Sequence, residues 1–330
     1  MACTLENKRL RFETPEWSGV VALDSTGNML RLFHKKTQME ILRQPESEEA
    51  LKESPMVYGI PLLFPPNRIR DGVFRADGRE FRFAVNEADT HCALHGIVIG
   101  REFELKSLEE TESLLRIAVA YRFDAERPEF AGFPCPFTAE IIYEIRASGM
   151  THLVRIRNDG DRALPLGVGF HTAFAAPDEE NVRIEVPHRP EGAWRIDAVR
   201  HLPDGSVRPW SETEEGVLSG KRGVSGVGFS AMYRQPETAR TARIHRKNGT
   251  VRYEFDSKYA HGACWNQGGT RGFFCIEPMS WMTDAPNVPL PAEVSGFALL
   301  PAHETAEYAS LITVELKKNG SLKRGSLEFY

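Results

Sequence analysis

The chain contains 330 residues, of which 41% are hydrophobic and 26% are charged. These proportions are ordinary for a soluble globular protein and supply enough apolar side chains for a large core. Lysine and arginine together number 41, and aspartate and glutamate 46, so the formal net charge is −5. A mildly acidic chain without a concentrated basic face argues against nucleic acid as the main partner.

No segment approaches the roughly 18 to 20 apolar residues that span a bilayer, so we expect no membrane partner. Charged residues between Glu6 and Arg11 occupy the position where a secretory signal needs an apolar stretch. The five cysteines contain no Cys-x-x-Cys pair, which indicates reduced thiols and argues against structural zinc. These features predict a cytoplasmic location.

Short β-rich patterns dominate the chain from end to end. In chain order, the expected strands are 115–123, 138–145, 152–156, 182–186, 294–300 and 308–316, and 243–255 is expected to be a hairpin around the Asn248-Gly249 turn. Only residues 45–53 have a helical pattern. Many short strands without interleaved helices predict an all-β protein built as an antiparallel sandwich or barrel.

Proline and glycine, with 21 and 27 residues, are spread along the chain rather than gathered in a linker. Since the chain has no composition break, low-complexity tract or internal repeat, we expect a single domain over residues 1–316. Residues 317–330 include Lys317, Lys318, Lys323 and Arg324. We expect this segment to be a basic, solvated C-terminal tail.

A proline-rich segment, 58–69, contains Asn67 and Arg68 immediately after an apolar stretch. Its three prolines restrict the backbone, so Arg68 is expected on a rigid loop. A planar guanidinium there can donate to sugar hydroxyls or to carboxylates. A structural arginine that binds loop carbonyl groups is an equally good interpretation of the pattern.

Two histidines, His91 and His95, stand four residues apart, a spacing that places two metal ligands on one face of a helix. Gly96 and the surrounding strand pattern argue against a helix, and no third ligand lies nearby in the sequence. We therefore expect no metal site. His95 is then either a hydrogen-bonding loop residue or a satisfied core histidine.

His171 and Glu277 each lie inside an apolar, aromatic stretch of the sequence. Charged groups are rarely buried without a partner, so both positions indicate a functional cleft or a structural ion pair. A histidine and a carboxylate in one cleft can act together as acid and base. Structural ion pairs also occur in such surroundings, so the residues alone leave both interpretations open.

Together these segments resemble the aldose 1-epimerase (galactose mutarotase) family. Each motif is weak alone, but four occur in family order with family-like separations across most of the chain. They are Gly59-Ile60-Pro61 with Phe64-Pro65 and Asn67-Arg68-Ile69, then Leu94-His95-Gly96, then Gly169-Phe170-His171, then Glu277-Pro278-Met279 with Asp284-Ala285-Pro286-Asn287. The resemblance implies a β-supersandwich fold, which agrees with the strand pattern.

The resemblance also implies roles for the site residues. Glu277 would remove the proton from the anomeric hydroxyl of an aldose, and His171 would protonate the ring oxygen, so that the ring opens and recloses as the other anomer. Asn67, Arg68 and His95 would bind the sugar. The reaction implied needs no metal and no cofactor, and the partner is a small-molecule sugar; we expect a monomer or a homodimer.

Reference pKa values of about 6.5 for histidine and 4.3 for glutamate allow a protonated imidazole beside an ionised carboxylate near neutral pH. We therefore expect His171 to be the acid in its charged form and Glu277 to be an ionised base. Phe64 and Trp281 are candidates to pack against the apolar faces of a pyranose, although a core position is the alternative for both.

One family feature is missing. An aspartate that precedes a phenylalanine and binds sugar hydroxyls in the family has no counterpart in residues 223–229, and Asp256 is the candidate to replace it. Two other functions stay open. The first is a hexose-6-phosphate 1-epimerase, because Arg70, Arg75, Arg79 and Arg82 could supply a phosphate site. The second is a non-catalytic carbohydrate-binding or sensor protein that uses the same cleft.

Overall fold

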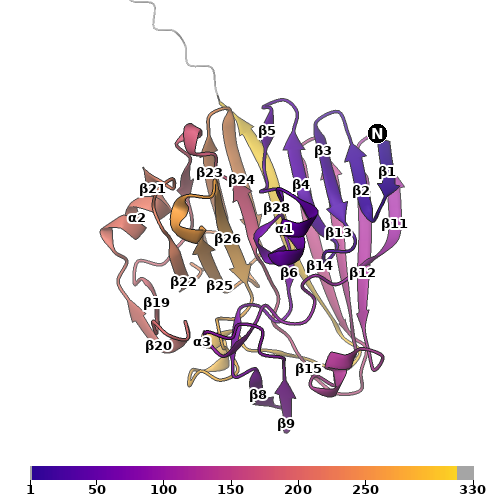
Figure 1. Cartoon of the computed structure of the whole chain (residues 1–330), viewed down its shortest axis with the longest axis vertical. Helices are drawn as coiled ribbons and strands as arrows, with labels where there is room; N and C mark the ends of the chain where they lie inside the picture. The colour runs from indigo at the N-terminus through magenta and orange to yellow at the C-terminus, as the bar shows by residue number, and fades with distance from the viewer. Residues whose placement is uncertain (1, 318–330) are drawn as a thin grey trace, which may run out of the picture.

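The structure is a computed structural model that describes residues 2–317. It consists mainly of antiparallel β-sheets, which confirms the predicted fold class (Figure 1). Within the described residues, the largest sheet has nine strands. Their spatial order is β11 (Glu104–Glu110), β12 (Leu115–Phe123), β13 (Phe137–Arg146), β14 (Gly149–Asn158), β28 (Thr305–Leu316), β24 (Gly249–Phe255), β23 (Thr241–Arg246), β18 (Arg183–Glu185) and β21 (Ser219–Gly223).

Two further sheets complete the main architecture of residues 2–317. The N-terminal sheet runs in chain order through β1 (Ala2–Glu6), β2 (Arg9–Glu13), β3 (Trp17–Ala22), β4 (Asn28–His34) and β5 (Met39–Glu40). The third sheet joins β22 (Ser230–Arg234), β25 (His261–Trp265), β26 (Phe273–Met279), β16 (Gly169–Phe170) and β6 (Leu62–Leu63), and β17 (Thr172–Ala175) also pairs with β26. This third sheet holds the candidate active site described below.

Short strand pairs and helices fill the ends of the sandwich. The pairs are β7 (Arg68–Arg70) with β10 (Cys92–Leu94), β8 (Val73–Ala76) with β9 (Arg79–Arg82), β15 (Leu164–Pro165) with β27 (Leu299–Leu300), and β19 (Ala193–Ile196) with β20 (Pro203–Arg208). The α-helices are α1 (Glu48–Glu53), α2 (Glu212–Leu218) and α3 (Ala292–Ser295), and 3-10 turns span Pro55–Val57, Pro128–Ala131, Asp178–Glu180 and Gln267–Gly269. No helix among residues 2–317 is both long and apolar enough to cross a membrane.

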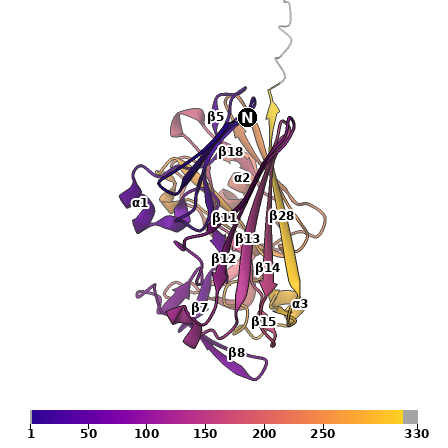
Figure 2. The same ribbon diagram turned by 90° about the vertical axis from the view of Figure 1, so that its right-hand side faces the viewer.

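The core lies between layers of sheet. In Figure 2 the long strands β12, β13, β14 and β28 lie on one side of the molecule, and the N-terminal strands with α1 lie on the other. Strand β24 illustrates how one face of a strand enters this core. Val251, Tyr253 and Phe255 are buried, and the residues between them are not. Tyr253 packs against Phe174 of β17 with ring centroids 5.3 Å apart, which joins the nine-stranded sheet to the sheet that holds the site.

Several predicted elements are confirmed. The predicted strand at 115–123 coincides with β12, the hairpin at 243–255 is formed by β23 and β24, and the helical pattern at 45–53 contains α1. The predicted strand at 294–300 is wrong except at its end, where Leu299–Leu300 form β27, because α3 occupies Ala292–Ser295 and Gly296 ends it with a φ of 75°. The sequence analysis also missed α2, although Ser211 and Glu214 form a capping box at its start.

The predicted basic tail at 317–330 lies outside the described residues except for Lys317.

Candidate active site

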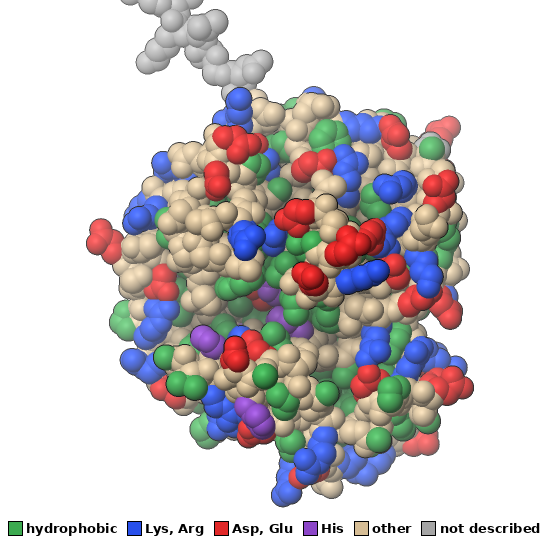
Figure 3. Space-filling view, viewed as in Figure 1, with side chains coloured by type: hydrophobic (Ala, Val, Ile, Leu, Met, Phe, Trp, Pro, Cys, Tyr) green, Lys and Arg blue, Asp and Glu red, His purple; other side chains and the backbone are tan. Residues whose placement is uncertain are grey.

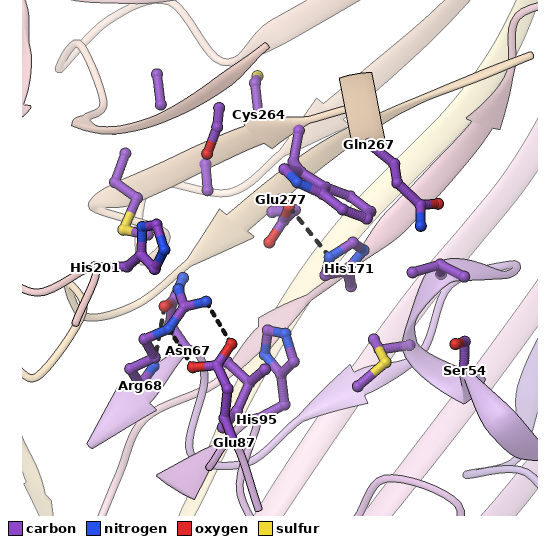
Figure 4. A pocket seen from close by; sticks show the side chains of 18 of the residues that line it. Ser54, Asn67, Arg68, Glu87, His95, His171, His201, Cys264, Gln267 and Glu277 are labelled. Atoms are coloured by element: carbon purple, nitrogen blue, oxygen red, sulfur yellow. Dashed lines mark hydrogen bonds and ion pairs between the residues drawn. The ribbon is translucent and has the colours of Figure 1, made fainter. Parts of the chain in front are cut away.

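Strand pairing in the third sheet brings His171 and Glu277 together. Glu277 lies in β26, and His171 occupies the break between β16 and β17, both of which pair with that strand. The backbone N–H of His171 donates to the carbonyl of Pro61, which fixes the break (3.2 Å). As a result, Nε2 of His171 lies 3.4 Å from Oε1 of Glu277, and Figure 4 shows the two side chains facing each other.

Burial sets the charge state of this pair. His171 is 5% exposed and Glu277 is 3% exposed. Loss of water raises the pKa of Glu277 to about 8, a change that the nearby Arg68 partly opposes. The same loss of water lowers the pKa of His171 to about 4. Burial therefore favours a proton on Glu277 and a neutral His171 in the sugar-free cleft, contrary to the expected ionised glutamate and protonated histidine.

His95 lies beside the pair. Its ring is edge-on to the ring of His171, with centroids 5.4 Å apart and an interplanar angle of 89°. Burial, together with the nearby His171 and Arg68, lowers the pKa of His95 well below its usual range. The structure therefore brings His95 into the cleft as a buried, neutral imidazole.

A tight backbone packing places His95. The residue has a φ of 64°, and its N–H donates to the carbonyl of Asn67 (2.9 Å). The next residue, Gly96, has a φ of 73°, and a Cβ there would lie 2.0 Å from the carbonyl oxygen of Phe64. Only glycine can approach the Phe64 backbone so closely, so Gly96 holds the segment that carries His95 against the proline-rich segment.

The metal spacing of the two histidines is not realised. His91 and His95 flank strand β10 rather than a helix turn. The His91 side chain is 69% exposed and its Nδ1 contacts Asp71 Oδ1 at 2.9 Å, whereas His95 is buried in the cleft. The two side chains therefore do not form one site.

Arg68 and Asn67 are also in the cleft. The Arg68 guanidinium donates from Nε to Oε2 of Glu87 at 2.6 Å and from Nη2 to Oε1 at 2.7 Å. Thr90 also donates its hydroxyl to Oε2 of Glu87. The Asn67 side-chain oxygen accepts the backbone N–H of Arg68 (2.9 Å), so one end of this amide is used by the loop itself. Arg68 thus enters the cleft already paired with a carboxylate.

The last motif segment supports the loop rather than the chemistry. Asp284 is fully buried, and its Oδ1 accepts the N–H of Arg70 at 3.0 Å and the side-chain amide of Asn287 at 2.7 Å. Its own N–H donates to the carbonyl of Arg68 at 2.9 Å. Asp284 therefore stabilises the position of strand β7, which carries Arg68.

These residues line a cavity of about 890 Å³. Its walls come from β22, β25 and β26, from the β7–β10 pair, and from the segment between β19 and β20. In Figure 3, histidine side chains are visible inside the hollow near the middle of this face. A volume in this range is typical of small-molecule sites and accommodates a monosaccharide.

Two aromatic residues that the sequence analysis did not identify line the cavity. Trp265 packs edge-on against the ring of His171 at 5.7 Å, and Trp194 contributes from β19. The proposed sugar-stacking role for Trp281 and Phe64 is wrong. Both are fully buried outside the cavity, and the Trp281 indole donates to the carbonyl of Pro66 at 3.2 Å.

The structure also corrects the proposed substitute for the missing aspartate. Asp256 does not line the cavity; its carboxylate accepts the N–H groups of Lys258 and Ala309, each at 2.8 Å. The strand that follows residues 223–229 contributes Ser230, Ala231 and Met232 to the cavity wall. That wall is therefore neutral where the family pattern led us to expect an acid.

Glu87 is a third cavity residue that the sequence did not indicate. It lines the cavity and binds both Arg68 and Thr90, yet in the sequence it is an ordinary acidic residue in a polar loop. Since the pairing spans 19 positions and depends on the β7–β10 geometry, the sequence pattern carried no signal for it.

The architecture is that of galactose mutarotase-like proteins. The chain is similar to a galactose mutarotase-like protein of solved structure from Clostridium acetobutylicum, with a TM-score of 0.90 and 27% identity over 96% of this chain and 98% of that chain. A galactose 1-epimerase from Lactobacillus acidophilus NCFM has a TM-score of 0.72 at 12% identity over 93% and 94% of the two chains, a likeness of fold alone.

The sequence comparison is more specific. A family model for aldose 1-epimerase matches residues 21–309, and the chain therefore belongs to the aldose 1-epimerase family. This membership supports an epimerase activity in general terms. Among curated proteins, the chain is 30% identical to the uncharacterized protein YihR of Escherichia coli (strain K12) over 122 residues, which are 36% of this chain and only 37% of that protein.

Proposed function

We propose that the protein is an aldose 1-epimerase that interconverts the α and β anomers of a free aldohexose. The single observation that supports this most directly is the buried His171–Glu277 pair, 3.4 Å apart, in a cavity large enough for one monosaccharide. We assign the activity to one domain over residues 1–316.

Anomer exchange requires one proton to leave the anomeric hydroxyl and another to reach the ring oxygen. In our proposal the Glu277 carboxylate accepts the hydroxyl proton, and protonated His171 donates to the ring oxygen. The C1–O5 bond breaks as the C1 carbonyl forms, the C1–C2 bond rotates, and the reverse steps close the ring on the other face. Two positioned groups are sufficient for this chemistry.

The sugar-free pair holds its proton on Glu277, so this assignment needs the proton to move to His171 when sugar binds. The move conserves the number of protons on the pair. Hydrogen bonds from sugar hydroxyls stabilise the carboxylate form, and the charge of Arg68 already favours it. Binding would thus create the acid and the base in the same step.

Three neighbouring residues would position the sugar. His95 is buried and neutral and can donate a hydrogen bond to the ring oxygen region without adding charge. Arg68 has one guanidinium nitrogen, Nη1, outside its pair with Glu87, and this nitrogen is available to a hydroxyl. The Asn67 amide group lines the same wall.

Trp265 and Trp194 would provide the apolar surfaces for the sugar. A pyranose has faces of C–H groups that pack well against aromatic rings, and Trp265 is in contact with the acid of the proposed pair. The neutral wall at Ser230 and Met232 would contact the part of the sugar that an aspartate contacts elsewhere in the family.

The four arginines considered for a phosphate site do not line the cavity, although Arg43, Arg208 and Arg271 do. Arg70 pairs with Asp284 at 3.3 Å, Arg75 with Glu80 at 2.8 Å, and Arg79 with Asp77 at 3.1 Å. Arg82 pairs with the same Glu80 carboxylate. Sugar phosphates therefore serve as comparison substrates in the test below.

The test is polarimetry on freshly dissolved α-glucose and α-galactose with the protein, without it, and with the Glu277→Gln variant. We expect acceleration over the spontaneous rate, reduced by about 100- to 10,000-fold in the variant. The same assay on glucose 6-phosphate separates the phosphorylated branch.

A well-folded protein that accelerates neither sugar contradicts the proposal. If the protein binds these sugars in calorimetry without accelerating their exchange, the non-catalytic binder is the correct interpretation. Glu80→Gln is the matched control, because Glu80 pairs with Arg75 on the β8–β9 hairpin, outside the cavity.

A further inference from the structure

A thiol lies directly beside the proposed acid–base pair. Cys275 precedes Glu277 by two positions in β26, so the two side chains point to the same face of the strand. Ligand atoms of His171, Cys275 and Glu277 lie within 4.8 Å of one another, and all three residues are buried. The proposed mechanism uses two of these groups and gives Cys275 no role.

The surroundings of the thiol are apolar. Cys275 is fully buried, packs with Ala173 and Phe273, and Trp265 covers this cluster. Cys275 does not line the cavity, whereas His171 and Glu277 do. The thiol therefore lies behind the pair, and a small ion that enters the cavity can reach all three groups only from the side of the pair.

The combination of one thiol, one imidazole and one carboxylate matches the ligand chemistry of a soft or borderline divalent cation such as Zn²⁺. A tetrahedral zinc with typical bond lengths separates its ligand atoms by roughly 3.3 to 3.8 Å. The 3.4 Å between His171 Nε2 and Glu277 Oε1 already falls in this range. The other two ligand-atom distances are at most 4.8 Å. They must shorten by up to about 1 Å to reach the spacing that zinc requires.

We propose that His171, Cys275 and Glu277 form an inhibitory binding site for a thiophilic divalent cation, with Zn²⁺ as the model ion. The inhibition rests on the proposed function, because the ion would occupy the proposed acid and the proposed base. The binding of the ion does not depend on that function. Binding displaces two protons to solvent, one from the Cys275 thiol and one from the protonated Glu277 of the sugar-free cleft, and leaves the fourth zinc position open to water from the cavity. Neither oxidation nor reduction is involved.

The site should discriminate among ions. Mg²⁺ and Ca²⁺ require mainly oxygen ligands, and this cluster offers one carboxylate. We therefore expect no inhibition by either ion at concentrations where Zn²⁺ inhibits. The unpartnered, buried Nδ1 of His171 limits the affinity, because zinc-bound histidines are normally supported at the other ring nitrogen.

The experiment has two arms, applied to the purified full chain, Cys275→Ser, Cys275→Ala and Cys135→Ser. The first arm titrates Co²⁺ and follows the thiolate-to-cobalt absorption band. The second measures Zn²⁺ inhibition of anomer exchange, each variant relative to its own metal-free rate. Cys135 is the matched control, since it is a buried thiol that lies outside both the cavity and the cluster.

We expect both Cys275 variants to lose the cobalt band and to raise the inhibitory Zn²⁺ concentration at least 10-fold, while Cys135→Ser behaves as the unmodified protein. A band that persists without Cys275, or equal Zn²⁺ inhibition in all variants, overturns the inference. Melting curves identify any variant that fails to fold. If one Cys275 variant fails to fold, the cobalt and zinc measurements on the other Cys275 variant test the inference.

The cobalt arm separates this inference from the proposed function. If no sugar is turned over but the band depends on Cys275, the metal site stands and the epimerase proposal fails. If sugars are turned over and no Cys275-dependent band forms, the metal site fails and the epimerase proposal stands.

Discussion

The guanidinium of Arg68 and the carboxylate of Glu87 form a two-pronged ion pair at the wall of the cavity, with N–O distances of 2.6 and 2.7 Å. Their side chains are 16% and 24% exposed, so the pair is sheltered from water. Such paired contacts fix the plane of the guanidinium as well as its position. Glu87 therefore determines which nitrogen of Arg68 faces the cavity and how its charge is placed relative to Glu277.

The first prediction concerns this pairing. Glu87→Gln removes the charge that holds Arg68 and leaves one side of the fork without an acceptor. Because hydrogen bonds to charged groups contribute about 1.5 to 3 kcal/mol, we expect kcat/KM to fall about 10- to 100-fold. The loss should appear mainly in KM, since Glu87 positions a binding residue and transfers no proton. Steady-state polarimetry measures both parameters.

Glu80→Gln is the control for this experiment, because Glu80 also binds an arginine but is outside the cavity. An unchanged KM in Glu87→Gln would show that Arg68 does not need its partner.

The second prediction concerns stability and pH. The folded protein holds a proton on Glu277 up to a pKa of about 8, whereas the unfolded chain loses it near the ordinary value of 4.5. The contribution of the protonated Glu277 to stability is therefore complete below pH 4.5 and is lost as the pH rises to about 8. The limiting slope for one proton is about 1.4 kcal/mol per pH unit.

Glu277→Gln has no proton to lose. Its melting temperature relative to the unmodified protein should therefore increase between pH 5 and pH 8. His171 contributes in the opposite sense below pH 6.5, because its pKa is lowered to about 4, but this contribution is present in both proteins and cancels in the difference. A difference that stays flat over this range would mean that Glu277 is ionised in the folded protein. Glu80→Gln should give that flat line.

The sequence predicted the fold and indicated the candidate site residues for physical reasons that are local. The strand pattern of β12 and the hairpin of β23 and β24 depend on neighbouring residues, and both elements are confirmed, although the turn residues are Lys247 and Asn248 and Gly249 already begins β24. His171 and Glu277 were identified because titratable groups in apolar stretches are unusual. Their 3.4 Å separation was implied only by the family resemblance, since it depends on how β16, β17 and β26 pair.

The predictions that failed depended on how distant segments of the chain pack together. Trp281 lies four residues after Glu277, beyond the end of β26, and is buried in the core, whereas Trp265 reaches the cavity from the adjacent strand β25. The Asp256 carboxylate accepts hydrogen bonds from two backbone N–H groups, and the sequence pattern does not indicate these contacts. The charge state of Glu277 also could not be predicted, because it follows from complete burial and not from residue type.

The third prediction tests how Gly96 positions His95. Gly96 and Gly100 have similar φ values of 73° and 69°, but a Cβ would lie 2.0 Å from Phe64 O at Gly96 and would contact nothing within 4 Å at Gly100. An alanine at either position incurs the backbone strain of a positive φ, roughly 1 to 2 kcal/mol. Gly96→Ala adds a steric clash that should cost about 1 to 3 kcal/mol more.

Chemical unfolding measures these two free energies. We also expect Gly96→Ala to reduce kcat/KM, because the shift moves His95, and Gly100→Ala to leave it unchanged. Equal destabilisation by the two substitutions would contradict the close approach of Gly96 to Phe64.

The last prediction separates the two tryptophans. Trp265 lines the cavity and contacts the His171 ring at 5.7 Å, so Trp265→Ala should raise KM by about 10-fold through loss of a sugar-packing surface worth roughly 1 to 1.5 kcal/mol. Trp281 is fully buried and packs against Phe297, so Trp281→Ala should cost about 3 to 5 kcal/mol of folding free energy. Anomer exchange and denaturant unfolding, measured on both variants, give the two readouts. If Trp265→Ala left KM unchanged while lowering stability as much as Trp281→Ala, the residue would be part of the core and the cavity would bind its sugar through polar contacts alone.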